Sequence, residues 1–298
     1  MTTPSSAVGR RGSILVEQAN IINHEEYPGQ QYVMTVKAPK IVKRARAGQF
    51  VHIRCGFELP MRRPLSIMRV EEHSGCMDLL YKVVGTGTRI LASRHKNEIL
   101  DIMGPIGEPF RLDAKRPRPL LIGGGVGIPP MVFLADTIRR SESDYRPLAI
   151  LGSELPFPFK LVQSKFVLPS LNHSPHNASA LKMLEDWGVP SRLTSLQDYS
   201  GCYQGYVTDL ARLWLNGQNE AQLRETSVYA CGPEPMLKAV AKLAAEFELP
   251  CQISLEEYMA CAVGGCAGCV VKINTENGPA MKRVCVDGPV FDAYAVYS

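Results

Sequence analysis

The sequence has little net charge and no long uninterrupted apolar run. Its 33 Lys and Arg residues nearly balance 29 Asp and Glu residues, which leaves a formal charge of +4. A surplus this small argues against nucleic acid or an acidic lipid surface as the partner. The most apolar stretch, 119–135, is interrupted by Gly and Pro residues. It therefore predicts a buried strand, a loop and a helix start, and no membrane span.

The first 13 residues lack the apolar core of a secretory signal, and residues 1–12 are expected to form a flexible tail. Nine cysteines without such a signal indicate a reducing compartment, the cytoplasm, in which thiolates stay free to bind metal. We find no internal repeat. A length of 298 residues allows about two domains with ample core.

Four cysteines near the C-terminus form the most specific motif. Their spacing is C-x4-C-x2-C-x15-C, and its first two intervals are those of plant-type [2Fe–2S] proteins. Glycines in the loop 261–269 allow backbone N–H groups to close around cluster sulfurs. A zinc site is the alternative, but such sites usually show two C-x2–4-C pairs, and here only Cys266 and Cys269 form one. The motif predicts a [2Fe–2S] cluster and electron transfer, with zinc or ordinary buried cysteines as alternatives.

The pattern of apolar residues changes twice along the chain. Short β-rich runs in 13–115 predict an antiparallel barrel or sandwich. Strands alternate with helices in 116–249, which predicts a doubly wound parallel sheet. Residues 250–298 are too few for a large core of their own and are expected to be held by metal and by the rest of the protein. The Pro-rich stretch Leu155–Asn177 is expected to be a long irregular insertion.

Two motifs in the first predicted domain suggest a nucleotide. Arg63 can pair with a pyrophosphate, and strand alternation places Ser66 where its hydroxyl can meet a ring nitrogen. Gly87 and Thr88 precede an apolar helical segment whose N-terminus can offer N–H groups to a phosphate. Taken alone, each motif also fits a surface turn or an ordinary strand-to-helix corner.

The second predicted domain contains a glycine loop between a strand and a helix. Such a loop lets the backbone approach a pyrophosphate. It is not the G-x-G-x-x-G fingerprint, since Ile128 and Pro130 occupy the region where the final glycine is required. Cys231 ends a later strand and would lie at the carboxyl edge of the sheet, where ligands of α/β folds bind. Composition alone favours an ordinary buried cysteine there.

The order of these motifs resembles the ferredoxin–NAD(P) reductase superfamily over nearly the whole chain. The cysteine-bearing tail and the segment Gly205–Leu210 resemble one branch, the electron-transfer subunits of dihydroorotate dehydrogenase B. This resemblance implies an FAD-binding β-barrel, an NAD-binding α/β domain and a small C-terminal [2Fe–2S] segment.

The resemblance also implies roles for individual residues. Ser66 and Cys231 would be the catalytic residues, Ser66 orienting the flavin and Cys231 lying near the reacting nicotinamide. The implied FAD-binding residues are Arg63, Pro64, Leu65, Ser66, Leu80, Tyr81, Lys82, Gly87 and Thr88. The implied NAD(H)-binding residues are Gly123, Gly124, Gly125, Gly127, Pro129, Cys231, Gly232, Pro233 and Met236. The implied cluster ligands are Cys261, Cys266, Cys269 and Cys285.

Three features depart from the family pattern. Leu65 stands where the superfamily often has an aromatic residue, and Ala262 stands where glycine is frequent. The Pro-rich insertion lies beside the expected adenosine pocket. Glu154 follows the strand after the first helix of the α/β domain and favours NADH over NADPH, although a solvated loop glutamate fits equally well.

The implied activity is transfer of electrons from NADH through FAD and the cluster to an FMN-containing catalytic subunit in a hetero-oligomer. There, dihydroorotate would be oxidised to orotate in pyrimidine biosynthesis. This acceptor rests on the resemblance alone, because no residue here is recognisably a dihydroorotate-oxidising group. Related chains serve hydrogenases, sulfur reductases and transhydrogenase-type complexes. A zinc-binding nucleotide sensor is the non-enzymatic alternative.

Overall fold

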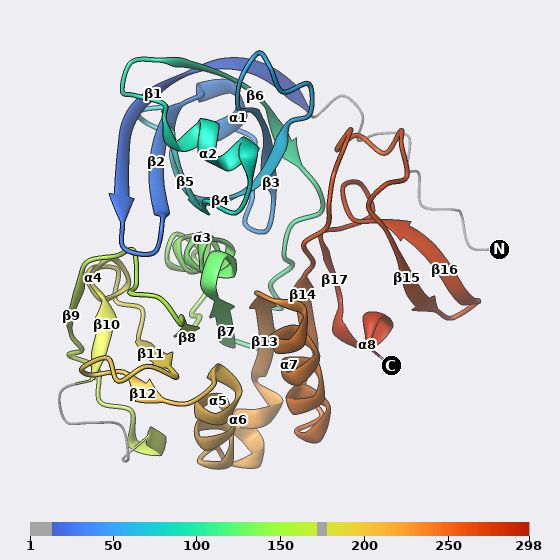
Figure 1. Cartoon of the computed structure of the whole chain (residues 1–298). Coiled ribbons are helices and arrows are strands. Elements are labelled where there is room, and N and C mark those ends of the chain that lie inside the picture. The colour runs from blue at the N-terminus through green and yellow to red at the C-terminus, as the bar shows by residue number, and fades with distance from the viewer. Residues whose placement is uncertain (1–13, 172–177, 298) are drawn as a thin grey trace.

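The computed structural model describes residues 14–171 and 178–297. The chain forms a closed barrel, a seven-stranded sheet with helices on both faces, and a C-terminal segment with a two-stranded ladder (Figure 1). The predicted tail 1–12 and the last part of the predicted insertion, 172–177, lie outside the described residues. Among the helices of the described ranges, none has the length and apolar content that crossing a membrane requires.

The barrel is antiparallel throughout, as predicted. Its strand order is β1-β2-β5-β4-β3-β6. Fully buried side chains such as Ile21, Met34 and Leu79 fill its interior, because alternate residues of a strand point to the same face. Its elements are β1 (Leu15–Tyr27), β2 (Gln31–Lys37), α1 (Pro39–Val42), β3 (Phe50–Arg54), β4 (Arg63–Glu71), β5 (Cys76–Lys82), α2 (Thr86–Ala92) and β6 (Ile99–Ile106).

The second sheet has the order β12-β11-β8-β7-β13-β14-β17. Its first six strands run parallel, as predicted, and β17 pairs antiparallel with β14. Its strands are β7 (Arg118–Gly124), β8 (Leu148–Gly152), β11 (Ser191–Ser195), β12 (Tyr203–Gln204), β13 (Thr226–Cys231), β14 (Cys251–Ser254) and β17 (Val290–Asp292).

Helices cover both faces of this sheet. Helix α3 (Ile128–Arg139) lies between the sheet and the barrel, whereas α5 (Val207–Asn216) and α7 (Glu234–Glu246) pack on the other face (Figure 1). The short helices α4 (Lys182–Asp186) and α6 (Glu220–Arg224) lie at the periphery. The all-round apolar character of α3 follows from this placement between two layers.

The described part of the predicted insertion is largely irregular, with a strand, β9 (Leu161–Gln163), and a single turn, η3 (Pro169–Leu171). Strand β9 pairs with β10 (Ser179–Leu181). The buried Arg192 guanidinium donates to the Ser164 hydroxyl at 2.9 Å and to the Phe166 carbonyl. These bonds fix the insertion to the sheet.

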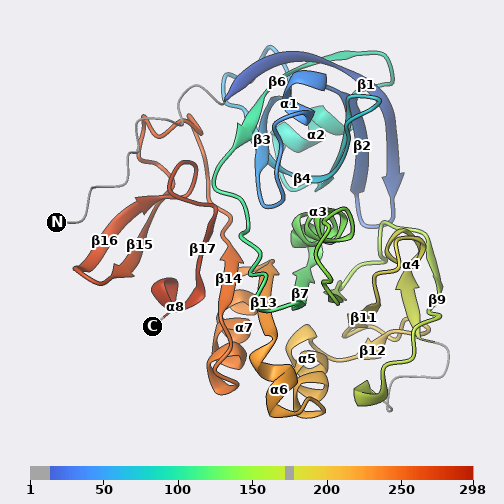
Figure 2. The same cartoon turned by 180° about the vertical axis from the view of Figure 1, so that it is seen from behind.

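The C-terminal segment contains β15 (Val270–Thr275), β16 (Gly278–Arg283), β17 and α8 (Ala293–Val296). The ladder of β15 and β16 lies beyond the β14 and β17 edge, on the opposite side of the molecule from β9 and β10 (Figure 2). Both β14 and β17 fall within the predicted segment 250–298, so the parallel sheet continues past the predicted boundary. The reason is that the edge of β13 pairs with the next strand of the chain. The domain boundaries stay predictions.

Candidate functional site

The structure brings the two barrel motifs together. Arg63 opens β4, and its side chain lies on the α-carbon of Gly87 in the first turn of α2: a Cβ on Gly87 would stand 2.6 Å from the Arg63 Nε. A larger residue at position 87 would force the Arg63 side chain to move from this place. The two motifs, each weak alone, thus form one surface.

Neighbouring arginines have different surroundings. The Arg62 guanidinium pairs with the Asp101 carboxylate at 2.8 Å and donates to the Asp101 carbonyl. These bonds link the start of β4 to β6, so Arg62 has a structural role in the barrel. The Arg63 guanidinium donates only to the nearby carbonyls of Met61 and Arg62, and no carboxylate within the described ranges pairs with it. Arg63 is therefore the arginine whose charge is left for an anion.

Strand pairing determines on which face of the barrel wall the residues after Arg63 lie. Pro64 lies opposite His52 and Ser66 lies opposite Phe50, so these four side chains share one face of the barrel wall. Leu65 points to the other face and is largely buried. The half-buried Ser66 hydroxyl makes no hydrogen bond to any described residue, which leaves it available to a ligand.

Thr88 is engaged within its own loop. Its hydroxyl accepts from the Val84 and Gly85 amides at 3.0 and 3.2 Å and donates to the Gly85 carbonyl at 3.1 Å. Thr88 therefore shapes the start of α2. A pocket of about 440 Å³ borders the same helix, between loop 56–58 and the side chains of Ile90, Ser93, Arg94 and Glu98.

The predicted residues of β5 are divided by burial. Leu80 and Tyr81 are buried, whereas Lys82 is exposed. The Tyr81 hydroxyl lies 2.8 Å from His24 Nε2, and its ring stacks on Tyr32 with centroids 5.4 Å apart. Leu80 and Tyr81 thus contribute to the barrel core, while only Lys82 offers a charge to solvent.

The glycine loop and the Cys231 turn are in direct contact. A Cβ on Gly127 would lie 2.3 Å from the Cys231 carbonyl oxygen, and one on Gly124 would lie 2.5 Å from the Met236 sulfur. Gly232 also packs on Met236, where a Cβ would lie 2.5 Å from its methyl carbon. Gly127 is therefore required by the approach of one loop to the other, because its Cβ would meet backbone atoms, whereas the flexible Met236 side chain could move away from a Cβ on Gly124 or Gly232.

Other residues of the two turns begin helices or face open space. Pro129 lies in the first turn of α3, where a missing N–H costs nothing. Pro233 is exposed, and Gly123 is buried beneath the loop. Gly125 has a φ of +55°, and a Cβ there would meet nothing within 4 Å. The backbone at Gly125 is therefore open to a ligand.

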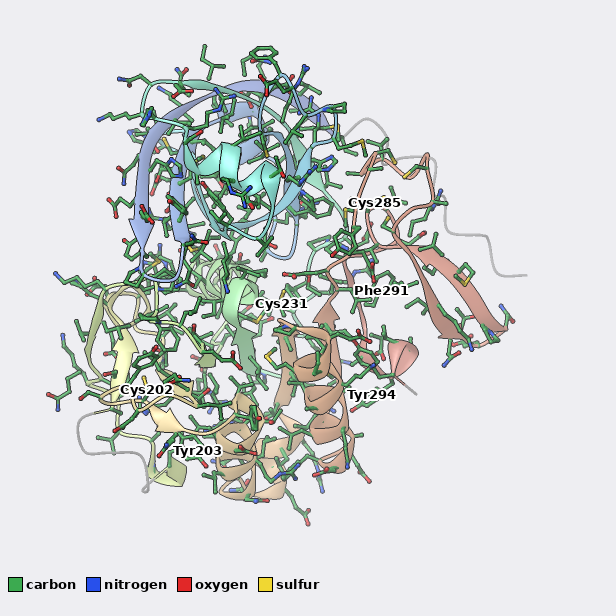
Figure 3. The ribbon with its side chains drawn as sticks, in the orientation of Figure 1. Cys202, Tyr203, Cys231, Cys285, Phe291 and Tyr294 are labelled. Carbon is green, nitrogen blue, oxygen red and sulfur yellow. The ribbon has the colours of Figure 1, made fainter. Side chains whose placement is uncertain are left out.

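Cys231 lies at the carboxyl end of β13, near the middle of the molecule (Figure 3). Burial raises the pKa of the Cys231 thiol, and the charge of Glu256 raises it further. The neighbouring Ser254 hydroxyl acts to lower this pKa, but its effect is smaller. The thiol is therefore neutral at physiological pH. Ser254 pairs with Cys231 across β13 and β14.

Glu256 was missed by the sequence analysis. Although the residue is exposed, the protein around it removes enough water to raise the pKa of its carboxyl. It follows β14 by two positions and influences the Cys231 thiol. No local motif marks it, because its proximity to Cys231 depends on sheet pairing.

The cysteine loop directs backbone N–H groups at sulfur. The amides of Gly265 and Cys266 donate to Cys261 Sγ at 3.3 and 3.4 Å, and the Gly268 amide donates to Cys266 Sγ at 3.4 Å. Burial acts to raise the pKa of the Cys261 thiol, but the surrounding N–H groups outweigh it and lower the pKa to about 7. The loop thus stabilises negative charge on sulfur.

The second half of the cysteine motif is buried. Cys269 and Cys285 are neighbours, and burial together with this contact raises the pKa of Cys285 to about 12. Figure 3 labels Cys285 in the C-terminal segment. The Arg283 guanidinium donates to the Gly264 carbonyl at 3.0 Å, which ties the loop to the strand before Cys285.

The four sulfurs do not form a closed shell in the structure. Within residues 14–171 and 178–297, no three His, Cys, Asp or Glu side chains stand close enough together to hold a metal ion. Cys266 is exposed at the loop tip, whereas Cys269 and Cys285 lie beneath it.

Ala262 and Ala267 both have a φ of +54°, which explains why glycine suits these positions. The donor set and the N–H groups fit an iron–sulfur cluster.

Comparison with known proteins agrees with this arrangement. Residues 256–297 match the family model of the iron–sulfur cluster binding domain of dihydroorotate dehydrogenase B. The chain is 31% identical over 267 residues to the dihydroorotate dehydrogenase B (NAD(+)) electron transfer subunit of Desulforamulus reducens, covering 89% of this chain and 92% of that protein. It is 32% identical over 281 residues to the subunit of the same name from Caldanaerobacter subterraneus, covering 94% and 97%.

Solved structures share the fold. An NADH-dependent reduced ferredoxin-NADP oxidoreductase, described in terms of flavin-based electron bifurcation, superposes with a TM-score of 0.74 at 26% identity and covers 94% of this chain and 90% of that one. The ferredoxin reductase of carbazole 1,9a-dioxygenase superposes with a TM-score of 0.59 at 20% identity, covering 80% and 67%. The second likeness is one of fold alone.

Proposed function

Because the chain belongs to the family of dihydroorotate dehydrogenase B electron transfer subunits, we propose that it passes electrons from NADH through bound FAD and a [2Fe–2S] cluster to the catalytic subunit of a dihydroorotate dehydrogenase. One observation carries the proposal: a cysteine loop that directs N–H groups at its sulfurs, in a chain that matches these subunits over nearly its whole length. We infer that the partner contains FMN and that the two form a hetero-oligomer. The cytoplasmic location stays a prediction.

FAD would be held by the surface that Arg63 forms with the start of α2. The guanidinium has no carboxylate partner among the described residues and so can pair with the pyrophosphate. Ser66 can donate its unbonded hydroxyl to the flavin ring. Pro64, Leu65, Leu80, Tyr81, Lys82 and Thr88 would shape this site, several of them through the barrel wall rather than by direct contact.

NADH would be held where the glycine loop meets the Cys231 turn. The open backbone at Gly125 can receive the pyrophosphate, and the N-terminus of the twelve-residue α3 follows it. The neutral Cys231 thiol offers a small, uncharged wall for a nicotinamide. Gly123, Gly124, Gly127, Pro129, Gly232, Pro233 and Met236 would support this arrangement by letting the two turns pack together.

Cys261, Cys266, Cys269 and Cys285 would be the cluster ligands. When bound, FAD accepts two electrons as a hydride and releases them singly to a one-electron cluster, which is why a carrier of both kinds is needed between NADH and the cluster. The chain contributes by holding these groups in order and by stabilising charge on sulfur with N–H groups. Zinc remains the alternative metal for the four thiolates.

A second candidate is a reductase subunit of a bifurcating or transhydrogenase-type complex. The observation that favours it is the likeness to the NADH-dependent reduced ferredoxin-NADP oxidoreductase, which extends over nearly the whole chain. The two candidates share the carriers and differ in the acceptor. Affinity purification separates them, because recovery of a different flavoprotein and no dihydroorotate dehydrogenase would refute the first.

The decisive experiment is the visible spectrum of anaerobically purified protein, with iron and acid-labile sulfide analysis, before and after NADH. A flavin and cluster spectrum that NADH bleaches is the expected result. Colourless protein that FAD, iron and sulfide do not reconstitute would refute the proposal and favour zinc. Repeating the titration with NADPH tests the nucleotide preference inferred from Glu154.

A further inference from the structure

The hairpin of β1 and β2 extends from the barrel to the start of the insertion in the α/β domain (Figure 1). The Gln31 side chain is only 4% exposed. Its amide group donates to the Pro28 carbonyl of the hairpin at 2.9 Å and to the Pro156 carbonyl of the insertion at 2.8 Å. One buried amide group therefore bonds two separate layers of the molecule.

Apolar contacts accompany this bond. The Leu155 side chain lies on the turn of the hairpin, since a Cβ on Gly29 would stand 2.7 Å from its Cδ1. Gly29 has a φ of +81°, the left-handed conformation that favours glycine. Gln31 itself pairs with Lys82 of β5, a strand of the proposed flavin site. The start of the insertion is thus attached to the flavin barrel by both polar and apolar contacts.

The preceding residues are fixed to the parallel sheet. The Ser153 amide donates to the Thr194 carbonyl of β11 at 3.1 Å. The Leu155 amide in turn donates to the Ser153 hydroxyl at 3.2 Å. Residues 153–157, called the strap below, therefore join the carboxyl end of β8 to the barrel.

Glu154 lies in the middle of the strap. Its backbone carbonyl accepts from the Tyr199 hydroxyl at 3.4 Å. Its side chain is exposed, and no residue of the described ranges bonds to its carboxylate. Strand β8 ends at Gly152, at the edge of the sheet where ligands of parallel α/β folds bind. The carboxylate is therefore free to accept from a ribose hydroxyl of a nucleotide, and its charge opposes a phosphate at the same place.

We propose that Gln31 is a positioning residue for nucleotide selection: it holds the strap against the barrel, fixes the Glu154 carboxylate at the edge of the nucleotide site, and so favours NADH over NADPH. The inference rests on the proposed function and deepens it, because the preference then depends on the flavin barrel as well as on the α/β domain. A carboxylate held in place discriminates better than one on a loose loop, which must first be ordered by the ligand.

The test compares variants of the full chain with FAD and cluster bound. Gln31→Met keeps the length and the apolar stem of the side chain but removes the donor. Glu154→Gln removes the charge, and a double variant combines the two changes. Gln18→Met changes an exposed glutamine of β1 and is the control.

The first readout is amide hydrogen exchange of a peptide that contains residues 153–159, measured by mass spectrometry, and it needs no electron transfer. We expect exchange to be about tenfold faster in Gln31→Met, because the strap opens more often once its bond to the barrel is lost. Exchange should stay near the parent rate in Gln18→Met. Equal exchange in these two variants would overturn the proposal.

The second readout is the ratio of the second-order rate constants for flavin bleaching by NADH and by NADPH. Gln31→Met should lower this ratio by about tenfold, the equivalent of one hydrogen bond to a charged group, while the limiting rate at saturating NADH is kept. A bond with a merely structural role would affect both nucleotides equally, so an unchanged ratio would overturn the proposal.

The double variant tests whether Gln31 acts through Glu154. In the Glu154→Gln background, Gln31→Met should change the ratio no further, because the group that it positions is already gone. A second tenfold decrease, additive to the first, would overturn this role.

The parent protein separates this inference from the proposed function. A parent that bleaches equally well with both nucleotides would overturn the inference and leave the proposed carriers standing. A parent without flavin or cluster signals would refute the proposed function, and hydrogen exchange would still decide whether Gln31 holds the strap.

Discussion

Substituting two glycines of the same loop should separate a packing requirement from a binding requirement. Gly127 has an ordinary φ of −85°, so alanine there costs no backbone strain. Its Cβ would lie 2.3 Å from the Cys231 carbonyl oxygen and 2.5 Å from the Gly232 amide nitrogen. Both neighbours are backbone atoms that cannot rotate away. The cost should be about 1–3 kcal/mol, towards the upper end, as for overpacked cores.

Gly125→Ala should act differently. A Cβ at Gly125 meets nothing within 4 Å, but the φ of +55° makes alanine strained by about 1–2 kcal/mol. The methyl group would project into the space assigned to the pyrophosphate. Losing one or two hydrogen bonds to a charged group, about 1.5–3 kcal/mol each, should raise the Kd for NADH by about tenfold or more.

Each substitution has a matched control in the chain. Gly85→Ala pairs with Gly127→Ala, because Gly85 has an extended backbone with φ of −167° and open space around its α-carbon. Gly188→Ala pairs with Gly125→Ala, because Gly188 has a φ of +75° and open space but lies far along the chain from the loop. Urea unfolding measures the free energies, and the NADH dependence of flavin bleaching measures binding.

The results that would refute the reasoning are specific. If Gly127→Ala is as stable as Gly85→Ala, the two loops do not approach each other as described. If Gly125→Ala and Gly188→Ala bind NADH equally well, the glycine loop does not hold the pyrophosphate. Equal stability of Gly125→Ala and Gly188→Ala, with weaker NADH binding only in the first, is the expected outcome.

Three further predictions concern the flavin, the cluster and pH. Arg63→Ala should weaken FAD binding by about tenfold or more, because charge-assisted contacts are lost. Arg62→Ala should mainly lower stability, because the Asp101 carboxylate loses its partner. If both variants retain FAD equally well, the flavin site lies elsewhere. Cys266→Ser should abolish the cluster signals while NADH still bleaches the flavin. Cys76→Ser, outside the cysteine motif, is the control. Loss of bleaching in Cys266→Ser would mean that the cysteine segment and the flavin site are structurally coupled. Burial, aided by the charge of Arg62, lowers the pKa of His52 from 6.5 to about 4. Since the unfolded state then binds more protons between these values, stability should fall by about 3 kcal/mol as pH drops from 6.5 to 4, and His52→Leu should lack this part of the urea-unfolding profile.

Much of the architecture could be predicted from sequence because it depends on local patterns. Short β-rich runs predicted the barrel strands, and the strand, glycine and proline pattern around 119–135 predicted β7 and the start of α3. The cysteine spacing predicted an iron–sulfur segment, which the family match supports. These features need only neighbours within a few residues.

The sequence by itself determined which chemical groups the protein has and in which order, since spacing and periodicity are properties of short stretches of chain. The tertiary structure alone decided which groups meet. The contact of Arg63 with Gly87 and that of Gly127 with Cys231 join loops from different strands. The hydrogen bond from the Glu108 amide to the Gly288 carbonyl joins the C-terminal segment to the chain that leaves the barrel. Burial and hydrogen-bond partners come from such distant neighbours, and no local pattern contains them.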